Sequence, residues 1–421
     1  MTRRTWFRWH SWIGLTTGLL LFVVCWSGTI AVFSREIDLA LDPAVSAAAP
    51  TNRVAWGAFE RNIAAERPGW WLMQMTASHG PGTTLEAWAE DEAGAIWRVD
   101  GDPASGAVIG VRSLFGVQRF FRSFHMALFI ETWPIAGVPL GDWIVALLSI
   151  PLLASLVTSL VFYRRFWRGF LKLERRRGAR VFWSDAHKLT GLWSLWFVLA
   201  IALTGLWYLA ERHLPEGAQP PRIATTKNPH LLGVGELVER AQRAYPELRI
   251  NAVILRDVEL GLFEVHGQDG GVLVRDRAAR VWLDSRSGAV LRVQRSADLR
   301  PYERWIEMAD PVHFGNFAGL ASKVPWFVLG LALSGLCLSG AYLQAKRQER
   351  HPGATYRLPV LAAYGITVAC LILASWFGYE EIMSYGTGGA PPALPAAVTA
   401  FIAAWTAATV AILTVWMRWV R

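Results

Sequence analysis

The stretch HSWIGLTTGLLLFVVCWSGT, residues 10–29, decides the fold class of this chain. A helix needs about 20 mainly apolar residues to cross the hydrocarbon core of a bilayer, and this stretch has that length. A second stretch, HKLTGLWSLWFVLAIALTGL at residues 187–206, has the same layout. Each begins with His, has Gly four residues later, and ends near a Ser-Gly or Thr-Gly pair. The two stretches therefore predict membrane helices built on one repeated plan.

The composition of the whole chain agrees with a membrane protein. Of its 421 residues, 53% are hydrophobic and only 18% are charged, and there are 23 Trp, a residue that anchors helices at the bilayer interface. These values exclude disordered, coiled-coil and collagen-like proteins. The three Cys lie in apolar runs and form no CxxC motif. Six apolar stretches are long enough to span: 10–33, 142–163, 187–209, 322–343, 358–377 and 396–417.

The net charge of +9 is explained by topology. Lys and Arg gather at the N-terminus, in the 164–186 and 344–357 connections and at the C-terminus, whereas the 378–395 loop has Glu380 and Glu381 and no basic residue. Because positive residues stay in the cytoplasm, both termini are predicted to be cytoplasmic. Contact with anionic membrane lipids accounts for the basicity, and a nucleic-acid partner is not expected.

The two long loops, about 34–141 and 210–321, are therefore predicted on the opposite side of the membrane. Each has a helix-like stretch followed by alternating strand-like runs. Each ends in a related phrase, Asp102-Pro-Ala-Ser-Gly106 in the first loop and Asp284-Ser-Arg-Ser-Gly288 in the second. Asp followed four residues later by Gly is typical of a tight hairpin turn. Its recurrence in equivalent loops predicts a duplicated α+β module.

Four histidines recur in this duplicated plan. His10 and His187 begin helices that run outward, so we expect them at one cytoplasmic depth. His125 and His313 precede returning helices, so we expect both at the outer face, with His125 on an amphipathic segment of about 120–130. Ionisable groups at membrane helices are functional candidates, and neutral imidazole is a good iron ligand.

The glycines one turn after the first two histidines fit such a site. Gly14 and Gly191 follow His10 and His187 by four residues and share their helix faces. Small residues there leave room for a flat macrocycle or a close helix contact.

At this point the chain resembles the PepSY-associated transmembrane proteins. The resemblance rests on His10-x-x-x-Gly14-Leu15, His187-x-x-x-Gly191-Leu192-Trp193, Asp310-Pro-Val-His313-x-Gly315 and the paired Asp-x-x-Ser-Gly turns, and it covers about residues 4–347. The family includes inner-membrane, haem-containing reductases of ferric siderophores in Gram-negative bacteria. The resemblance implies two b-type haems with His10, His187, His125 and His313 as axial ligands of the iron.

The expected fold is a membrane all-α helical bundle of six transmembrane helices with internal duplication, carrying two small periplasmic α+β PepSY-like modules. The expected units are helix 1 (1–34), module 1 with the His125 segment (35–141), helix 2 (142–163), a basic cytoplasmic loop (164–186), helix 3 (187–209), module 2 with the His313 segment (210–321), helix 4 (322–343) and C-terminal helices 5 and 6 (344–421).

The expected function is electron transfer across the bacterial inner membrane to a ferric siderophore or another ferric chelate. Arg119 and Arg122 are expected to bind haem propionates or an anionic substrate, because guanidinium pairs with carboxylate in a bidentate manner. No catalytic residue is identified from the sequence. Because the cytoplasmic loops are too short for a reductase domain, electrons must come from a separate donor, a cytoplasmic reductase or a quinol.

Two other classes of function stay open. The first is a transporter that moves an iron chelate without redox chemistry, which would be recognised by broken helices or buried charge at mid-membrane; the sequence predicts neither. The second is a non-enzymatic protein whose PepSY-like modules bind or regulate a periplasmic partner.

Overall fold

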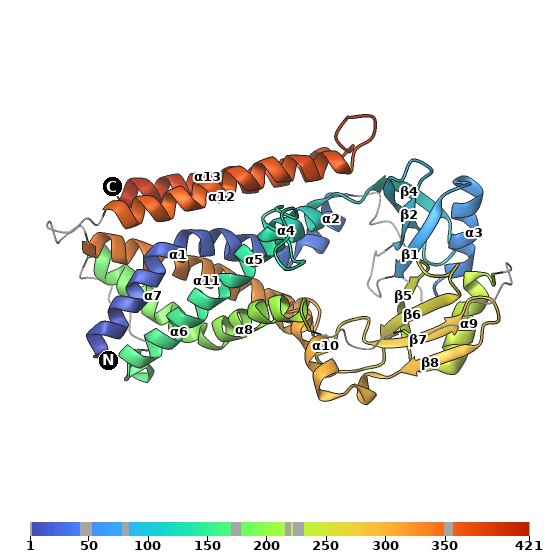
Figure 1. Cartoon of the computed structure of the whole chain (residues 1–421), viewed down its shortest axis with the longest axis horizontal. Coiled ribbons are helices and arrows are strands. Elements are labelled where there is room, and N and C mark those ends of the chain that lie inside the picture. The colour runs from blue at the N-terminus through green and yellow to red at the C-terminus, as the bar shows by residue number, and fades with distance from the viewer. Residues whose placement is uncertain are drawn as a thin grey trace.

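The structure is a computed structural model that describes residues 2–42, 53–77, 84–169, 178–214, 220–221, 231–348 and 357–420. It has a helical part at one end and a β-sheet at the other (Figure 1). Residues 170–177 of the predicted basic loop lie outside the described residues.

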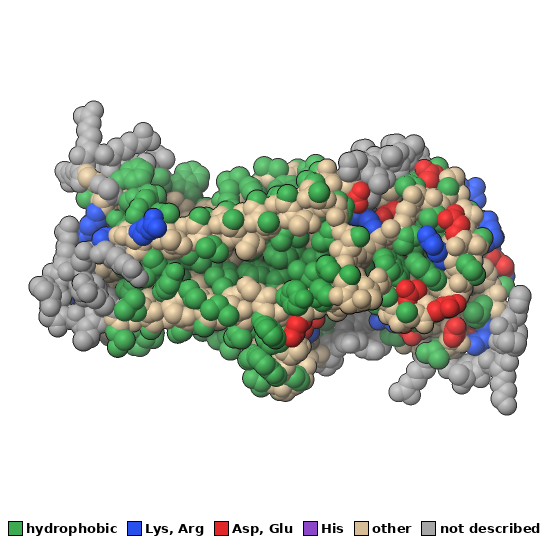
Figure 2. All heavy atoms as spheres, turned by 90° about the horizontal axis from the view of Figure 1, so that it is seen from above, with side chains coloured by type: hydrophobic (Ala, Val, Ile, Leu, Met, Phe, Trp, Pro, Cys, Tyr) green, Lys and Arg blue, Asp and Glu red, His purple; other side chains and the backbone are tan. Residues whose placement is uncertain are grey.

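The helical part has the character of a membrane bundle. Five of the described helices are long and apolar enough to cross a bilayer, and a sixth is added if one bent pair counts as a span. Its helices are α1 (Arg3–Ala31), α5 (Leu140–Leu147), α6 (Ser149–Phe162), α7 (Ala179–Trp193), α8 (Leu195–Glu211), α11 (Leu320–Gln348), α12 (Arg357–Ser384) and α13 (Ala396–Val420). On the face that Figure 2 shows, hydrophobic side chains cover this part and most charged side chains gather over the sheet.

The span predicted over 187–209 is not a continuous helix. α7 and α8 meet at Ser194 with a bend of 67°. The prediction that no helix is broken is therefore wrong. The Oγ of Ser194 donates a hydrogen bond to the carbonyl oxygen of Thr190 at 2.7 Å, a bond that competes with the helical ladder.

The two modules do not form separate sheets. Their strands make one antiparallel sheet of eight strands in the order β4-β3-β2-β1-β5-β6-β7-β8. The strands are β1 (Trp71–Ala77), β2 (Leu85–Glu90), β3 (Ile96–Gly101), β4 (Val108–Ser113), β5 (Arg249–Ile254), β6 (Leu262–Gln268), β7 (Ala279–Asp284) and β8 (Val290–Gln294). Strands β1 and β5 join the two halves, with Met75 opposite Val253. This pairing removes an exposed edge from each module, which the prediction of two separate modules did not foresee.

One face of the sheet carries the core of this part. Helices α3 (Trp56–Glu66) and α9 (Val234–Ala244) cover that face (Figure 1). Phe59, Leu237, Val265 and Val281 are among the fully buried residues that pack there.

The two predicted turns have nearly the same hydrogen bonds. Asp102 Oδ1 accepts from the backbone N–H of Ser105 at 2.7 Å, and Asp284 Oδ1 accepts from that of Ser287 at 2.7 Å. Gly106 and Gly288 have φ of +75° and +69°, which explains glycine at both positions. The hydrogen bonds from Ser105 hold the pKa of Asp102 below its usual value.

Three helices lie between the bundle and the sheet (Figure 1). They are α2 (Ser34–Leu41), α4 (Val117–Ala127) and α10 (Pro301–Phe314). Helix α4 forms from the segment predicted to be amphipathic and carries His125, and α10 carries His313. The start of α1 and the end of α13 lie at the opposite end of the molecule, remote from the sheet.

Candidate functional site

The first pair of histidines lies at the end of the bundle that carries the chain termini. The rings of His10 on α1 and His187 on α7 have centroids 6.3 Å apart. Nδ1 of His10 lies 3.0 Å from the carbonyl oxygen of Ser155 on α6. Nδ1 of His187 lies 2.9 Å from Oγ of Ser339 on α11. Four helices thus contribute to this site. We call His10 and His187 the inner pair.

The second pair lies at the sheet end of the bundle. The rings of His125 on α4 and His313 on α10 have centroids 6.1 Å apart. Nδ1 of His125 lies 3.0 Å from the carbonyl oxygen of Val24 on α1. Nδ1 of His313 lies 2.8 Å from Oγ1 of Thr204 on α8. We call His125 and His313 the outer pair.

The hydrogen bonds define the tautomer of all four rings. A carbonyl oxygen only accepts, so Nδ1 of His10 and of His125 must donate. The hydroxyls of Ser339 and Thr204 already donate to the carbonyl oxygens of Gly335 and Ala200, at 2.7 Å each. They therefore accept from His187 and His313. Each ring keeps a free lone pair on Nε2, and among the described residues no hydrogen bond reaches any of these four atoms.

A donating Nδ1 with a free Nε2 is the usual state of a metal-ligating histidine. Two imidazoles that ligate one ion from opposite sides, with bonds of about 2.0–2.1 Å, have ring centres roughly 6.3 Å apart. The two observed centroid separations, 6.3 and 6.1 Å, are of that size, and the ring planes are inclined to each other by 70° and 43°. Within the described residues no group of three or more His, Cys, Asp and Glu side chains is placed to hold a metal.

The two pairs lie near opposite ends of α1. His10 belongs to the inner pair, and Gly28 lies against the ring of His125. At about 1.5 Å rise per residue, these positions are roughly 27 Å apart along the helix. Leu15, Leu19 and Val23 are buried between them in the apolar core of the bundle.

The glycines differ in what surrounds them. A Cβ at Gly28 would lie 2.5 Å from Cε1 of His125, so glycine is required for the ring to lie there. A Cβ at Gly14 would meet no protein atom within 4 Å, and one at Gly191 would meet only Leu336 at 3.8 Å. Among the described residues, no side chain therefore fills the helix surface at Gly14, in contrast to that at Gly28.

Arg119 and Arg122 do not act alike. The Nε of Arg119 binds Oε1 of Glu381 on α12 at 2.9 Å, so the prediction that Arg119 binds a propionate or substrate receives no support from its contacts. Arg122 forms no hydrogen bond or ion pair with the described residues. It lies one turn from His125 on α4, where desolvation lowers the pKa of Arg122.

Arg275, in the connection between β6 and β7, holds the helix that carries His313. Asp310, one turn before His313, accepts a hydrogen bond from Nε of Arg275 at 2.6 Å and one from the hydroxyl of Tyr208 at 2.9 Å. Burial opposes ionisation of Asp310, but the bond to Arg275 outweighs it and lowers the pKa of Asp310. The ring of Tyr208 contacts that of His313, with centroids 5.1 Å apart. The Asp-Pro-Val-His motif thus ties the outer pair to the sheet.

Helix α4 is capped by a residue from α2. Asp38 accepts hydrogen bonds from the backbone N–H groups of Val117 and Gln118, at 2.7 and 2.8 Å. An acceptor at a helix N-terminus satisfies otherwise unpaired donors. Burial raises the pKa of Asp38 despite these bonds.

No role for the Nδ1 partners was predicted from the sequence, although two of them carry a visible signal. The matched pairs Ser27-Gly28 and Thr204-Gly205 recur at one offset from His10 and His187. In the structure the hydroxyls of Ser27 and Thr204 contact Nδ1 of His125 and His313, at 3.3 and 2.8 Å. Ser155 and Ser339 had no such signal.

Comparison with known proteins shows the family of the chain. A family model described as "PepSY-associated TM region" matches residues 7–347. An uncharacterised protein of Pseudomonas aeruginosa, PA4219, is 25% identical over 266 residues, which cover 56% of this chain. The match spans 65% of the length of that relative.

Proposed function

Because the chain belongs to the PepSY-associated transmembrane family, whose model covers both histidine pairs, we propose that it is a di-haem oxidoreductase. It would pass electrons across the bacterial inner membrane to a ferric siderophore or another ferric chelate in the periplasm. The observation that carries this proposal is the pairing itself: two imidazole rings lie with centroids 6.3 or 6.1 Å apart near each end of α1, and Nδ1 of every ring makes a hydrogen bond that leaves Nε2 unprotonated.

The residues fit haem b better than a metal held by protein alone. Each pair offers two imidazole nitrogens on facing rings, so the remaining ligands must come with the cofactor. Haem supplies reversible one-electron chemistry of iron when it is bound. The chain would supply His10, His187, His125 and His313 as ligands of the iron, with the tautomer that frees Nε2, and a helix surface at Gly14 that no described protein side chain fills.

The direction of transfer follows from the topology. His10 and His187 lie at the end that carries the chain termini, where a cytoplasmic reductase or a quinol would donate electrons. His125 and His313 lie beside the sheet, where the ferric chelate would be reduced. Hard oxygen ligands hold iron(III) far better than iron(II), so each transferred electron weakens the chelate and favours release of iron.

The test of the proposed reaction uses purified protein reduced with dithionite under anaerobic conditions. Addition of a ferric chelate is expected to re-oxidise the haem spectrum, and a chromogenic iron(II) chelator should detect one iron(II) per electron lost. The gallium(III) form of the same chelate is the control, because gallium(III) is not reduced. A reduced spectrum that no ferric chelate changes would remove the proposed reaction.

The bend at Ser194 favours one second candidate, a transporter of the chelate. Broken membrane helices are a common feature of transporter binding sites, and this break lies between His187 and Thr204. A transporter would move the iron(III) and gallium(III) chelates into vesicles equally well, and the protein would contain no haem.

The proposed orientation, with a cytoplasmic C-terminus and a periplasmic loop between α12 and α13, can be tested with reporter fusions. A reporter that is active only in the periplasm should be inactive when fused after Arg421. It should be active when fused after Gly389, in the loop between α12 and α13. The reason is the excess of Lys and Arg at the other end of the bundle. Periplasmic activity at Arg421 would contradict a cytoplasmic C-terminus.

A further inference from the structure

Helices α12 and α13 lie outside the duplicated part of the chain, yet they contact the helix that carries His125. Glu381 near the end of α12 accepts two hydrogen bonds from α4 through its Oε1. One comes from Nε of Arg119 at 2.9 Å and one from Oγ of Ser123 at 2.7 Å. Ser123 lies two residues before His125, so the bonds reach the middle of α4.

Glu381 is an unusual residue for mere helix packing. Its Oε2 is buried and has no hydrogen-bond partner among the described residues. A carboxylate at the end of a membrane helix is costly unless it is paired. Arg119 supplies that pair and also lies over the ring of Tyr385, 5.7 Å from its centroid. A displacement of α4 would therefore break the hydrogen bonds of Arg119 and Ser123 to Glu381.

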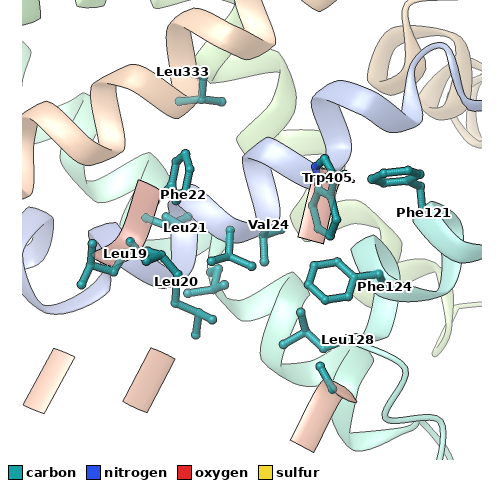
Figure 3. Close-up of a cluster of buried hydrophobic side chains, with 14 of the residues drawn as sticks. Leu19, Leu20, Leu21, Phe22, Val24, Phe121, Phe124, Leu128, Leu333 and Trp405 are labelled. Carbon is teal, nitrogen blue, oxygen red and sulfur yellow. The ribbon is translucent and has the colours of Figure 1, made fainter. Parts of the chain in front are cut away.

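Aromatic contacts hold the same helix from α13. The Trp405 ring lies 4.9 Å from that of Phe121 and 5.3 Å from that of Phe124, both edge to face. Figure 3 shows Trp405 beside these two rings. Such pairs stabilise beyond the apolar area that they bury. Phe124 directly precedes His125, so this contact restrains the backbone that carries the ligand.

The end of α4 is strained and is packed against α12. Leu128 and Phe129 have φ of +49° and +60°, a conformation that non-glycine residues rarely adopt. Strain of this kind persists only where the surroundings enforce it. Gly378 of α12 lies so close that a Cβ there would be 2.8 Å from Cδ2 of Phe129.

The helix of His313 is held in a different way. α10 is fixed by Arg275, which binds Asp310, and by Arg280, which binds Glu307 at 3.1 Å. Both arginines belong to the sheet part of the chain. The two histidines of the outer pair therefore have separate supports, and among the contacts named for the described residues those of α12 and α13 reach the helix of His125.

We propose that α12 and α13 position His125, with Glu381 as the positioning residue that fixes α4 through Arg119 and Ser123. The meaning of this for electron transfer rests on the proposed function, but the restraint on α4 does not. Glu381 touches no candidate ligand, and it acts through the helix that carries one.

The test compares Glu381→Gln with Glu380→Gln, which removes the exposed neighbouring carboxylate. Hydrogen exchange of the full-length protein in nanodiscs is followed at residues 117–127 and, for comparison, at residues 301–314. Glu381→Gln is expected to speed exchange in α4 at least tenfold and to leave α10 unchanged. Glu380→Gln should change neither. In haem-loaded protein, Glu381→Gln should shift the midpoint potential of one haem component only, and Glu381→Asp should restore part of the shift.

The outcomes separate this proposal from the proposed function. Unchanged exchange in α4 would overturn it. Faster exchange in both α4 and α10 would mean general destabilisation, and Ser123→Ala, which removes one bond and no charge, then decides. Faster exchange confined to α4 in Ser123→Ala supports the proposal, and no change overturns it. Protein without haem would remove the proposed function while leaving the exchange result valid.

Discussion

Replacement of His10 or His187 with alanine is expected to remove one haem and leave the other, and the two variants should lose the same component. His125→Ala and His313→Ala should each lose the second component. The reason is that the two rings within each pair have centroids about 6 Å apart. The two pairs themselves are separated by roughly 27 Å along α1. No ligand can therefore serve both sites.

Redox titration of the four variants, followed by absorption, distinguishes the components. His213→Ala is the matched control, because the His213 side chain is exposed at the end of α8, where its ring lies 5.9 Å from that of Trp143 and belongs to neither histidine pair. It should retain both haems. Loss of the same component in His10→Ala and His313→Ala would contradict the pairing. Retention of both haems in every variant would contradict ligation by these histidines.

The substitution Gly28→Ala is expected to act on the outer site alone. The new Cβ would lie 2.5 Å from Cε1 of His125 and 2.9 Å from its Nδ1. The ring cannot retreat without losing its hydrogen bonds to Val24 and Ser27. We expect the haem content to fall from about two per chain to about one, with the inner component unchanged.

Gly365→Ala on α12 is the control for this substitution, because a Cβ at Gly365 meets no atom within 4 Å. It should keep both haems. The measurement is the reduced-minus-oxidised spectrum, recorded beside that of His125→Ala. A Gly28→Ala protein with two unaltered components would show that His125 does not ligate in the position described.

The pairing of the histidines could be predicted because the direction of each membrane helix follows from the apolar stretches and from the placement of Lys and Arg. Helix direction places His10 with His187 and His125 with His313, and the structure brings these partners together. Their ligation of haem remains a prediction. The family assignment followed from the same motifs and is confirmed over residues 7–347.

Other features depend on contacts that no local pattern encodes. The joining of β1 to β5 unites strands from two distant loops. Arg119 pairs with Glu131 and, more closely, with Glu381, which is 262 residues away. The bend at Ser194 has no Pro near it, and the Gly191 that precedes it has a counterpart, Gly14, inside the unbroken helix α1, where Thr17 also makes the same bond to a preceding carbonyl. The Ser194 hydroxyl alone therefore does not account for the bend.

The claim that two histidine pairs hold two haems is tested most directly by quantifying haem in the purified wild-type protein and its four histidine variants. We expect about two haem b per wild-type chain and about one in each variant. A wild-type protein without a Soret band, prepared from cells supplied with haem, would contradict it.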